Sequence, residues 1–374
     1  MKVEVNSAAL ADAVTWTSQV IPARPARPIL SGVKIEAAEG LLKFSAFDYE
    51  QTARYSIEAS ISEEGTLVVH GKLLSDIAKN LPAENTTLST TDNRVHIKSG
   101  GASFNLQLMA ADEYPDLPTV PDTIGLVSGS AFNEAVNQAT IAVARDENRP
   151  VLTGVDLRFD DKKITLTATD RFRLSRASMA WQPATDVESG EALVRGSILK
   201  DVSRSVDPSQ EVTLGLDQKS GRMMSFQNVG HISTASLIDG EFPTVDRLFA
   251  DEYPVHAVID RMELVNSLRR VSLVAERNAP VTLEFSQDKV RLSAGDADES
   301  QAAEVISAQL TGQPITVAFN PSFLLDGLQA IAEPFVHIKM TTAIKPVEFN
   351  GQQSKDADPS MDYRYLLVPM RMTN

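Results

Sequence analysis

The chain has 374 residues, more than one ordinary hydrophobic core holds, so its length predicts two or three domains. Hydrophobic residues make up 43% and charged residues 23%, as in globular proteins, while the absence of cysteine excludes disulfides and thiolate chemistry. The formal net charge of −15 taken alone argues against a nucleic-acid partner, although a sum does not say where the cations lie. No apolar run approaches the ~20 residues that span a bilayer and the first ten residues lack a signal-like apolar stretch, so we expect a cytoplasmic protein with no membrane role.

Three copies of one pattern follow each other along the chain. Each opens on a segment with apolar residues three or four apart, which predicts a helix: 6–21, 128–144 and 260–275. Each continues with two alternating runs around a polar turn, which predict a β-hairpin: 28–48, 150–170 and 280–296. A second helical pattern then recurs: 72–82, 197–207 and 322–334.

The positions within the copies also agree. Asp76, Asp201 and Asp326 lie in the second helical segments at equal intervals of 125 residues. The first two copies close on 113-EYP-115 and 241-EFP-243. The repeat predicts an α+β fold of three domains, each with two helices packed on antiparallel sheets. The predicted boundaries give domains at 1–122, 123–250 and 251–374.

One turn differs between the copies. In 169-TDRFRLS-175, Asp170 stands where the other copies have Asp48 and Asp296, so we interpret it as a residue that ends a hairpin and not as a catalytic acid. The segment Arg171-Phe172-Arg173-Leu174 has no counterpart in the other copies. A feature confined to one copy of a repeat indicates function more than architecture.

Enzyme motifs are not found. The nearest phosphate loop, 65-GTLVVHGKL-73, has five residues between its glycines and Leu73 where a magnesium-binding hydroxyl belongs. The histidines never fall at metal-ligand spacing, and no nucleophile elbow or dinucleotide fingerprint appears. We therefore predict a non-enzymatic protein with no metal and no cofactor, although carboxylate enzymes can hide their residues anywhere in a sequence.

The basic residues gather on the predicted helix layer, while many acids fall in hairpins. Loops after the first helices and the helices themselves carry the cations: Arg24, Arg27, Arg145, Arg149, Arg277, Lys72, Lys79, Arg195, Lys200, Arg204, Arg269 and Arg270. One interpretation is that Lys and Arg simply suit helix surfaces. The other is a basic face that meets phosphates.

Simple geometry limits how such a face could surround DNA. A domain of ~125 residues has a radius of gyration of about 14 Å, which corresponds to a sphere about 35 Å across. A ring of three such spheres in contact leaves a central hole about 5 Å wide, and a ring of six leaves a hole of about 35 Å. A B-form duplex is roughly 20 Å wide and passes only the larger opening. Two chains of three domains would be needed, as in the closed two-fold rings of homo-oligomers.

The sequence resembles the bacterial DNA sliding clamp family, the beta subunit of DNA polymerase III. The threefold repeat, 163-KITLTATDRFRLS-175, 241-EFP-243 and the closing 365-YLLVPMRM-372 carry the resemblance along essentially the whole chain. It implies a head-to-tail homodimeric ring with pseudo-six-fold symmetry, which encircles double-stranded DNA without regard to sequence and acts as a processivity factor. The implied partners are the polymerase III alpha subunit, a clamp loader ATPase, and other polymerases and repair factors that dock through short peptides.

The resemblance also implies a peptide pocket between the second and third domains. Carried onto this chain, its residues are Leu152, Thr169, Arg171, Phe172, Arg173, Leu174, Pro243, Arg247, Leu248, Leu366, Val368, Pro369, Met370 and Arg371. Many members have Gly-His or Gly-Tyr in place of Arg171-Phe172, which would change one wall of the pocket. From the residues alone, the apolar run 366–370 is either a final core strand or a partner surface, and Pro369 suits a sheet edge. Arg173 and Arg371 beside it could bind backbone carbonyls or acids of a peptide.

The remaining implied sites concern DNA and ring closure. The DNA contacts would be Arg24, Lys79, Arg149, Lys200 and Arg204. The dimer interface would join the edge runs 102–109 and 301–308 and would include Leu106, Leu108, Leu273 and Glu304.

Two other classes of function stay open at this point. A metal-dependent nuclease or hydrolase could place acids at the junction of the second and third domains, in which case Asp170→Asn would abolish turnover. A monomeric peptide-binding scaffold without a DNA role would sediment at monomer mass.

Overall fold

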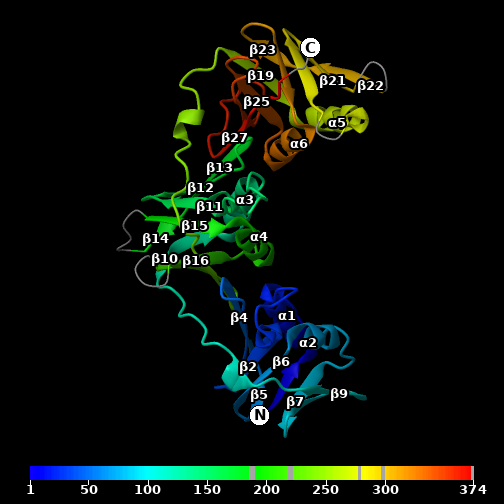
Figure 1. Cartoon of the computed structure of the whole chain (residues 1–374), viewed down its shortest axis with the longest axis vertical. Helices are drawn as coiled ribbons and strands as arrows, with labels where there is room; N and C mark the ends of the chain where they lie inside the picture. Colours follow the sequence, from blue (N-terminus) through cyan, green and yellow to red (C-terminus); the bar gives the residue numbers. More distant parts are fainter. Residues whose placement is uncertain (185–189, 218–221, 277–278, 296–299, 372–374) are drawn as a thin grey trace. The chain divides into compact units, whose positions relative to one another are not determined.

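A computed structural model of the 374-residue chain describes residues 1–184, 190–217, 222–276, 279–295 and 300–371. The chain forms two compact units. Unit 1 comprises Met1–Ser130, Gln182–Val187 and Arg204–Leu237, and unit 2 comprises Ala131–Trp181, Glu188–Ser203 and Ile238–Asn374. Figure 1 colours the chain from its N-terminus to its C-terminus and labels many of its elements. None of the described helices is long and apolar enough to cross a membrane.

The described part of unit 1 contains two antiparallel sheets. The five-stranded sheet has the order β5-β1-β7-β8-β9, with β1 Lys2–Asn6, β5 Ser60–Glu63, β7 Asn85–Thr91, β8 Arg94–Ser99 and β9 Ala102–Gln107. The nine-stranded sheet has the order β14-β10-β16-β17-β18-β4-β3-β2-β6. Its strands are β2 Gly32–Ala38, β3 Leu41–Phe47, β4 Gln51–Glu58, β6 Gly65–His70, β10 Thr123–Ser128, β14 Gln182–Pro183, β16 Glu211–Asp217, β17 Met223–Asn228 and β18 His231–Ser236.

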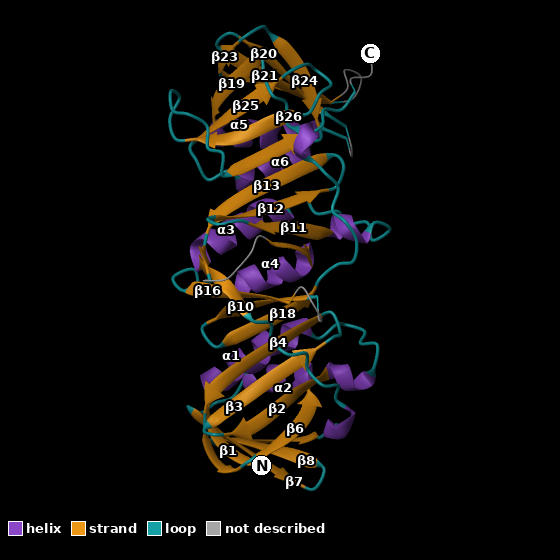
Figure 2. Cartoon of the chain, turned by 90° about the vertical axis from the view of Figure 1, so that its left-hand side faces the viewer, coloured by secondary structure: helices purple, strands orange, loops and turns teal. Residues whose placement is uncertain are grey.

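The helices of unit 1 cover one face of its sheets. In Figure 2, α1 (Ser7–Thr17) and α2 (Gly71–Ala78) lie behind the strands of this unit. Asn6 caps α1, because its side chain accepts hydrogen bonds from the backbone N–H groups of Ala8 and Ala9. Leu10 and Leu74 on the inner helix faces are fully buried with Phe44 of β3 in one hydrophobic core.

The described part of unit 2 contains two further antiparallel sheets. The nine-stranded sheet has the order β15-β11-β12-β13-β27-β26-β25-β19-β23, and the four-stranded sheet has the order β22-β21-β20-β24. The strands of the first are β11 Gly154–Phe159, β12 Lys163–Thr169, β13 Arg173–Ala180, β15 Gly190–Arg195, β19 Val255–Asp260, β23 Gln309–Thr311, β25 Phe335–Met340, β26 Val347–Gln352 and β27 Tyr363–Leu367. Those of the second are β20 Val281–Ser286, β21 Lys289–Gly295, β22 Gln301–Ser307 and β24 Ile315–Phe319.

The remaining helices complete the repeat pattern. They are α3 Gly129–Thr140, α4 Gly196–Ser205, α5 Arg261–Val271 and α6 Pro321–Ala330. Asp260 and Asn320 cap α5 and α6 with side-chain oxygens. All six predicted helical segments are therefore helices, and the α+β fold of helices against antiparallel sheets is confirmed.

The long sheets join neighbouring repeats, which the sequence did not predict. Strand β4 of the first repeat pairs with β18 of the second, and β13 of the second repeat pairs with β27 of the third. Each nine-stranded sheet thus contains strands from two repeats. This continuity explains why the compact units divide inside the second repeat and not at the repeat boundaries.

Two details differ from the sequence expectation. The runs that open on Pro28 and Pro150 begin as short 3₁₀ turns, Pro28–Ser31 and Pro150–Thr153, and become strands only at Gly32 and Gly154. Proline fits the first position of a helical turn because its missing N–H has no partner there. The expected hairpin end at Asp296, the cation Arg277 and Met372 lie outside the described residues.

Candidate functional site

The turn between β12 and β13 is closed by Asp170. Its Oδ1 accepts the backbone N–H groups of Phe172 and Arg173, both at 3.0 Å. Asp48 accepts those of Glu50 and Gln51 in the same way at the end of β3. Asp170 is therefore a turn residue, as the repeat indicated.

The next residue of each turn adopts a left-handed backbone. Arg171 has φ 80° and Tyr49 has φ 75°. Non-glycine side chains seldom adopt this region, because Cβ crowds the backbone there. Thr169 Oγ1 accepts the N–H of Arg171 at 3.2 Å and donates to the carbonyl of Arg173 at 2.7 Å, which holds the turn in place.

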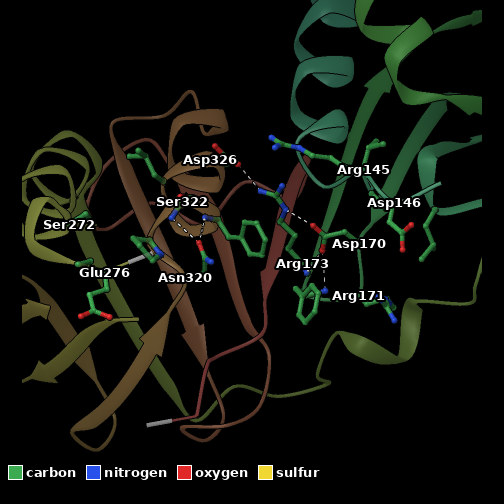
Figure 3. Close-up of a pocket in the computed structure, with 18 of the residues that line it drawn as sticks. Arg145, Asp146, Asp170, Arg171, Arg173, Ser272, Glu276, Asn320, Ser322 and Asp326 are labelled. Atoms are coloured by element: carbon green, nitrogen blue, oxygen red, sulfur yellow. Dashed lines mark hydrogen bonds and ion pairs between the residues drawn. The ribbon is translucent and has the colours of Figure 1, made fainter. Parts of the chain in front are cut away.

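Arg173 connects the turn to helix α6. Its Nε donates to Asp170 Oδ2 at 2.9 Å and its Nη1 to Asp326 Oδ2 at 2.7 Å, and its guanidinium lies 4.1 Å from the ring centre of Phe323. Figure 3 shows the side chain between the two carboxylates. Burial by itself would lower the pKa of Arg173, but the electrostatic effect of Tyr365 and the bonds to Asp326 and Asp170 raise it. Only 6% of the surface of Arg173 is exposed, so its side chain joins the turn to helix α6 inside the protein.

An apolar cavity of about 490 Å³ lies beside this turn. Leu174, Val245 and Leu366 form a small buried cluster next to it. Five of the ten lining residues are apolar, and two exposed arginines and one exposed glutamate also line the cavity. The lining residues are Arg149, Val151, Leu152, Thr169, Arg171, Glu241, Pro243, Thr244, Val245 and Leu248.

The first repeat fills the corresponding space. Phe47 stands there at the position of Thr169 and is buried against Ile29, Leu30 and Tyr114. A phenylalanine side chain occupies the volume that a threonine leaves open. The difference explains why the second repeat presents a cavity at this turn and the first presents a core.

A second cavity of about 920 Å³ adjoins the first and shares Arg149, Leu152 and Arg171 with it. The loop after α3, the turn around Arg173, the end of α5 and the start of α6 line it, as Figure 3 shows. Asn320 and Phe323 contribute from α6 and its cap. Sequence reasoning missed both residues, because nothing local marks them.

The apolar run 366–370 was interpreted as either a final core strand or a partner surface, and the structure contains features of both. Strand β27 lies between β13 and β26, so Leu366 belongs to an interior strand and is buried. Pro369 lies beyond that strand, so the expected sheet edge is wrong. Val368 and Met370 donate backbone N–H groups to the carbonyls of Phe172 and Ala318, at 2.9 and 2.7 Å. Val368 is itself exposed.

The predicted pocket residues therefore fall into groups. Leu152, Thr169, Arg171, Pro243 and Leu248 line the smaller cavity, while Phe172 and Arg173 line the larger one. Leu174 and Leu366 are buried beneath, and Arg247 lies exposed in the 3₁₀ turn Asp246–Leu248. In the described part of the chain, Val368, Pro369, Met370 and Arg371 line neither cavity. Sequence reasoning missed four residues of the smaller cavity: Val151, Glu241, Thr244 and Val245. Glu241 belongs to the 241-EFP-243 motif, and Thr244 and Val245 directly follow it.

The predicted DNA contacts are all on the surface. Arg24 and Arg149 lie in the loops after α1 and α3, and Lys79 directly follows α2. Lys200 and Arg204 are one turn apart on α4. All five side chains are exposed, and their contact with DNA stays a prediction.

The predicted dimer residues differ in exposure. Among the described strands, β9 and β22 each have a partner on one side only, as the expected interface requires. Leu273 is 84% exposed, whereas Leu106 is buried in the core of unit 1 and Leu108 is half-buried. Glu304 is held within its own chain by Arg270, whose Nε lies 2.9 Å from Oε2. An interface role for these residues stays a prediction.

Unit 2 contains a pair of histidines that their sequence spacing did not reveal. The Nδ1 atom of His256 lies 3.0 Å from Nε2 of His337, and Nδ1 of His337 lies 2.9 Å from Oε1 of Gln352. Since the glutamine oxygen accepts, His337 carries its proton on Nδ1 and accepts from His256. No group of three metal-ligating side chains occurs among the described residues.

We expect the stability of unit 2 to fall below neutral pH through His337. Burial lowers the pKa of His337 to about 4. Between pH ~6.5 and ~4 the unfolded chain binds a proton that the folded chain does not, so the free energy of unfolding falls by about 1–2 kcal/mol from pH 7 to pH 5. The chain has two tryptophans, Trp16 in unit 1 and Trp181 in unit 2, so urea unfolding of a Trp16→Phe variant reports unit 2 alone.

His337→Gln should remove this part of the pH dependence. His70→Gln changes a histidine of unit 1 and should leave the Trp181 transition unchanged. An equal pH dependence with and without His337 would contradict the assignment.

Comparisons with known proteins agree along the whole chain. Residues 1–118, 126–244 and 246–370 match, in turn, the N-terminal, central and C-terminal domains of the DNA polymerase III beta subunit. A beta sliding clamp of Streptomyces coelicolor is 40% identical over 375 residues and covers 100% of both chains. One from Micrococcus luteus is 36% identical over 83% of this chain and 100% of its own.

Solved structures agree as well. The DNA polymerase sliding clamp of Bacillus subtilis has a TM-score of 0.93 at 24% identity, and the beta subunit of Thermotoga maritima one of 0.88 at 26% identity. Each comparison covers 100% of both chains.

These matches confirm the resemblance and the three clamp domains, and they give no support to the nuclease alternative. DNA and a DNA polymerase are partners of such proteins. The chain belongs to the DNA polymerase III beta subunit family, the beta sliding clamps, and is a non-catalytic processivity factor of DNA replication.

Proposed function

We propose that two copies of this chain close head to tail into a ring around duplex DNA and tether the replicative polymerase through the smaller cavity. The observation that carries the tether is the apolar cavity of about 490 Å³ with the exposed Arg149 and Arg171 in its lining. Apolar side chains of a short peptide would fill it, and Arg171 would bind backbone carbonyls or acidic groups of the peptide.

Ring closure is supported by two sheet edges. Strand β9 of one copy would pair with β22 of the other, since each is an edge among the described strands. The exposed Leu273 lies close to β22 in the chain's fold, because the turn Ser272–Val274 contacts that strand. It would be covered by the second copy, together with Leu108 and Glu304. Leu106 would contribute through its backbone.

The DNA contacts would be made to phosphates. Arg24, Lys79, Arg149, Lys200 and Arg204 carry exposed cations on loops and helices, in a chain with net charge −15. Phosphate contacts hold DNA without reading its sequence, and salt weakens them. Further partners would be the alpha subunit of polymerase III, a clamp loader ATPase, and polymerases and repair factors with docking peptides.

Retention on circular DNA tests the ring. The chain would be loaded on nicked circular DNA with the clamp loader of the same organism and ATP, and then washed at about 1 M salt, where screening acts within ~3 Å. We expect the protein to remain on circles and to leave when a restriction enzyme linearises them. Leu273→Asp should reduce retention, because it places a charge in the closed interface. Equal retention on circular and linear DNA would overturn the ring, and sedimentation at monomer mass would favour a monomeric scaffold.

A further inference from the structure

One wall of the smaller cavity is the short segment 245–249, here called the wall segment. Its core is the 3₁₀ turn Asp246–Leu248, in which Leu248 N–H donates to the Val245 carbonyl at 3.0 Å and Phe249 N–H to the Asp246 carbonyl at 3.3 Å. A 3₁₀ turn has three residues per turn, so residues three apart share a side. Val245 and Leu248 line the cavity. Asp246 and Phe249 form the other side.

That other side rests on two arginines of the long sheet in unit 2. Arg176 of β13 and Arg364 of β27 stand directly opposite each other in the pairing that joins the second and third repeats. Like charges directly opposite in a sheet repel. The ring of Phe249 receives both guanidinium groups, with Arg176 at 4.8 Å and Arg364 at 3.8 Å from its centre.

Carboxylates complete the arrangement. Arg176 Nη2 donates to Asp246 Oδ1 at 2.7 Å. Arg364 forms two bonds of 2.8 Å to Glu348, whose side chain is 0% exposed and also accepts from Tyr253 at 2.7 Å. The wall segment is therefore attached to the sheet face through Asp246 and Phe249. Tyr253, four residues further along the chain, binds the same face through Glu348. Val245 and Leu248 line the cavity.

The first repeat contains an attachment equivalent to the one that Arg176 makes in the second repeat. Arg54 of β4 occupies the same position in the first repeat as Arg176 does in the second. Arg54 is paired with Ser45, two residues before the end of β3. Arg176 is paired with Thr167, two residues before the end of β12. Arg54 Nη2 donates to the carbonyl of Pro118. Pro118 lies three residues after 113-EYP-115, as Asp246 lies three after 241-EFP-243.

The third repeat has Ala303 at this register, paired with Ser293. The arginine thus occurs in the two repeats whose closing motif leads into a further repeat. In both, it binds the same position of the connecting segment.

We infer that Arg176, Arg364 and Phe249 are positioning residues of the peptide site, which hold Val245 and Leu248 in place for an apolar peptide side chain. This inference rests on the proposed peptide tether. None of the three lines the cavity in the described part of the chain, so they act through the wall segment. A wall held in its binding conformation loses less conformational entropy on binding, which raises affinity without a new contact.

Substitutions at Phe249 separate this role from general stability. Phe249→Leu keeps an apolar side chain but removes the aromatic face, whereas Phe249→Tyr keeps that face. Arg54→Gln is the matched control, because it loosens the equivalent attachment in unit 1, where Phe47 fills the space of the cavity. Leu248→Glu, which changes the cavity lining itself, marks the effect of a direct contact.

The probe is a fluorescein-labelled 15-residue peptide, the tightest binder from an array that tiles the replicative polymerase of the same organism. Anisotropy gives its Kd, and hydrogen exchange reports the amides of Leu248 and Phe249. For Phe249→Leu we expect both amides to exchange faster and the peptide Kd to rise about three- to tenfold, since two cation–π contacts are lost. Phe249→Tyr and Arg54→Gln should bind like the unchanged chain.

The outcomes are distinguishable. If the unchanged chain binds no peptide of the array, the tether fails and the inference falls with it. If the unchanged chain binds and Phe249→Leu binds equally well, the inference alone is overturned. An equal loss of affinity in Arg54→Gln would also overturn it, because the effect would then be one of general stability.

Discussion

Arg173→Met should lower the free energy of unfolding of unit 2 by about 3 kcal/mol, the lower end of the range for breaking a buried ion pair. Methionine roughly fills the volume of the arginine stem but leaves Asp170 and Asp326 without their cation. Asp170 is the costlier of the two, because its side chain is only 13% exposed, whereas Asp326 at 44% can be hydrated. Urea unfolding followed by Trp181 in the Trp16→Phe background measures the loss.

The same substitution should weaken peptide binding, because Arg173 holds the turn that carries Arg171. The control is Arg291→Met, which removes an exposed pair with Glu284 and should cost about 0.5 kcal/mol or less. Adding Asp326→Leu to Arg173→Met should recover part of the stability, since one unpaired carboxylate is removed. A loss below about 1 kcal/mol for Arg173→Met would mean that desolvation cancels the attraction in this cluster.

The second large effect is expected from Gly327→Ala in helix α6. An added Cβ would lie 2.3 and 2.4 Å from two ring carbons of Tyr365, a fully buried residue whose hydroxyl donates to the Phe323 carbonyl at 2.8 Å. Alanine favours a helix by about 1 kcal/mol over glycine, but overpacking a core costs about 1–3 kcal/mol and occasionally more. Because neither the helix nor the ring can move freely, we expect a net loss of about 2 kcal/mol.

Calorimetry of the whole chain, which records the unfolding of both units, would measure this loss. Gly101→Ala is the control, since an added Cβ there meets nothing within 4 Å. In a double-mutant cycle, Tyr365→Leu should cost less in the Gly327→Ala background than alone, because it removes the clash. A variant Gly327→Ala that is more stable than the unchanged chain would show that helix propensity dominates at this position.

The repeat and its elements followed from the sequence because their causes are local. Apolar spacing placed the six helices, alternation placed the hairpins, and the internal copies identified Asp170 as a turn residue. Each of these depends on neighbours within a few residues, such as the hydrogen bonds that Asp170 accepts from the backbone N–H groups of Phe172 and Arg173. The family resemblance rested on motifs of the same short range.

The site depended on contacts between distant segments, which local patterns do not encode. Arg173 was expected to bind a peptide, which stays a prediction, but no local pattern revealed that Asp326, 153 residues away, binds its guanidinium. Likewise Pro369 was expected at a sheet edge, and Phe249 was not singled out before it was found between two arginines. The sequence by itself therefore determined the three repeats, their helices and hairpins and the family. Only the tertiary structure decided which strands continue from repeat to repeat, where the cavity opens and which arginines remain available, because burial and ion pairing arise when remote side chains compete for the same space.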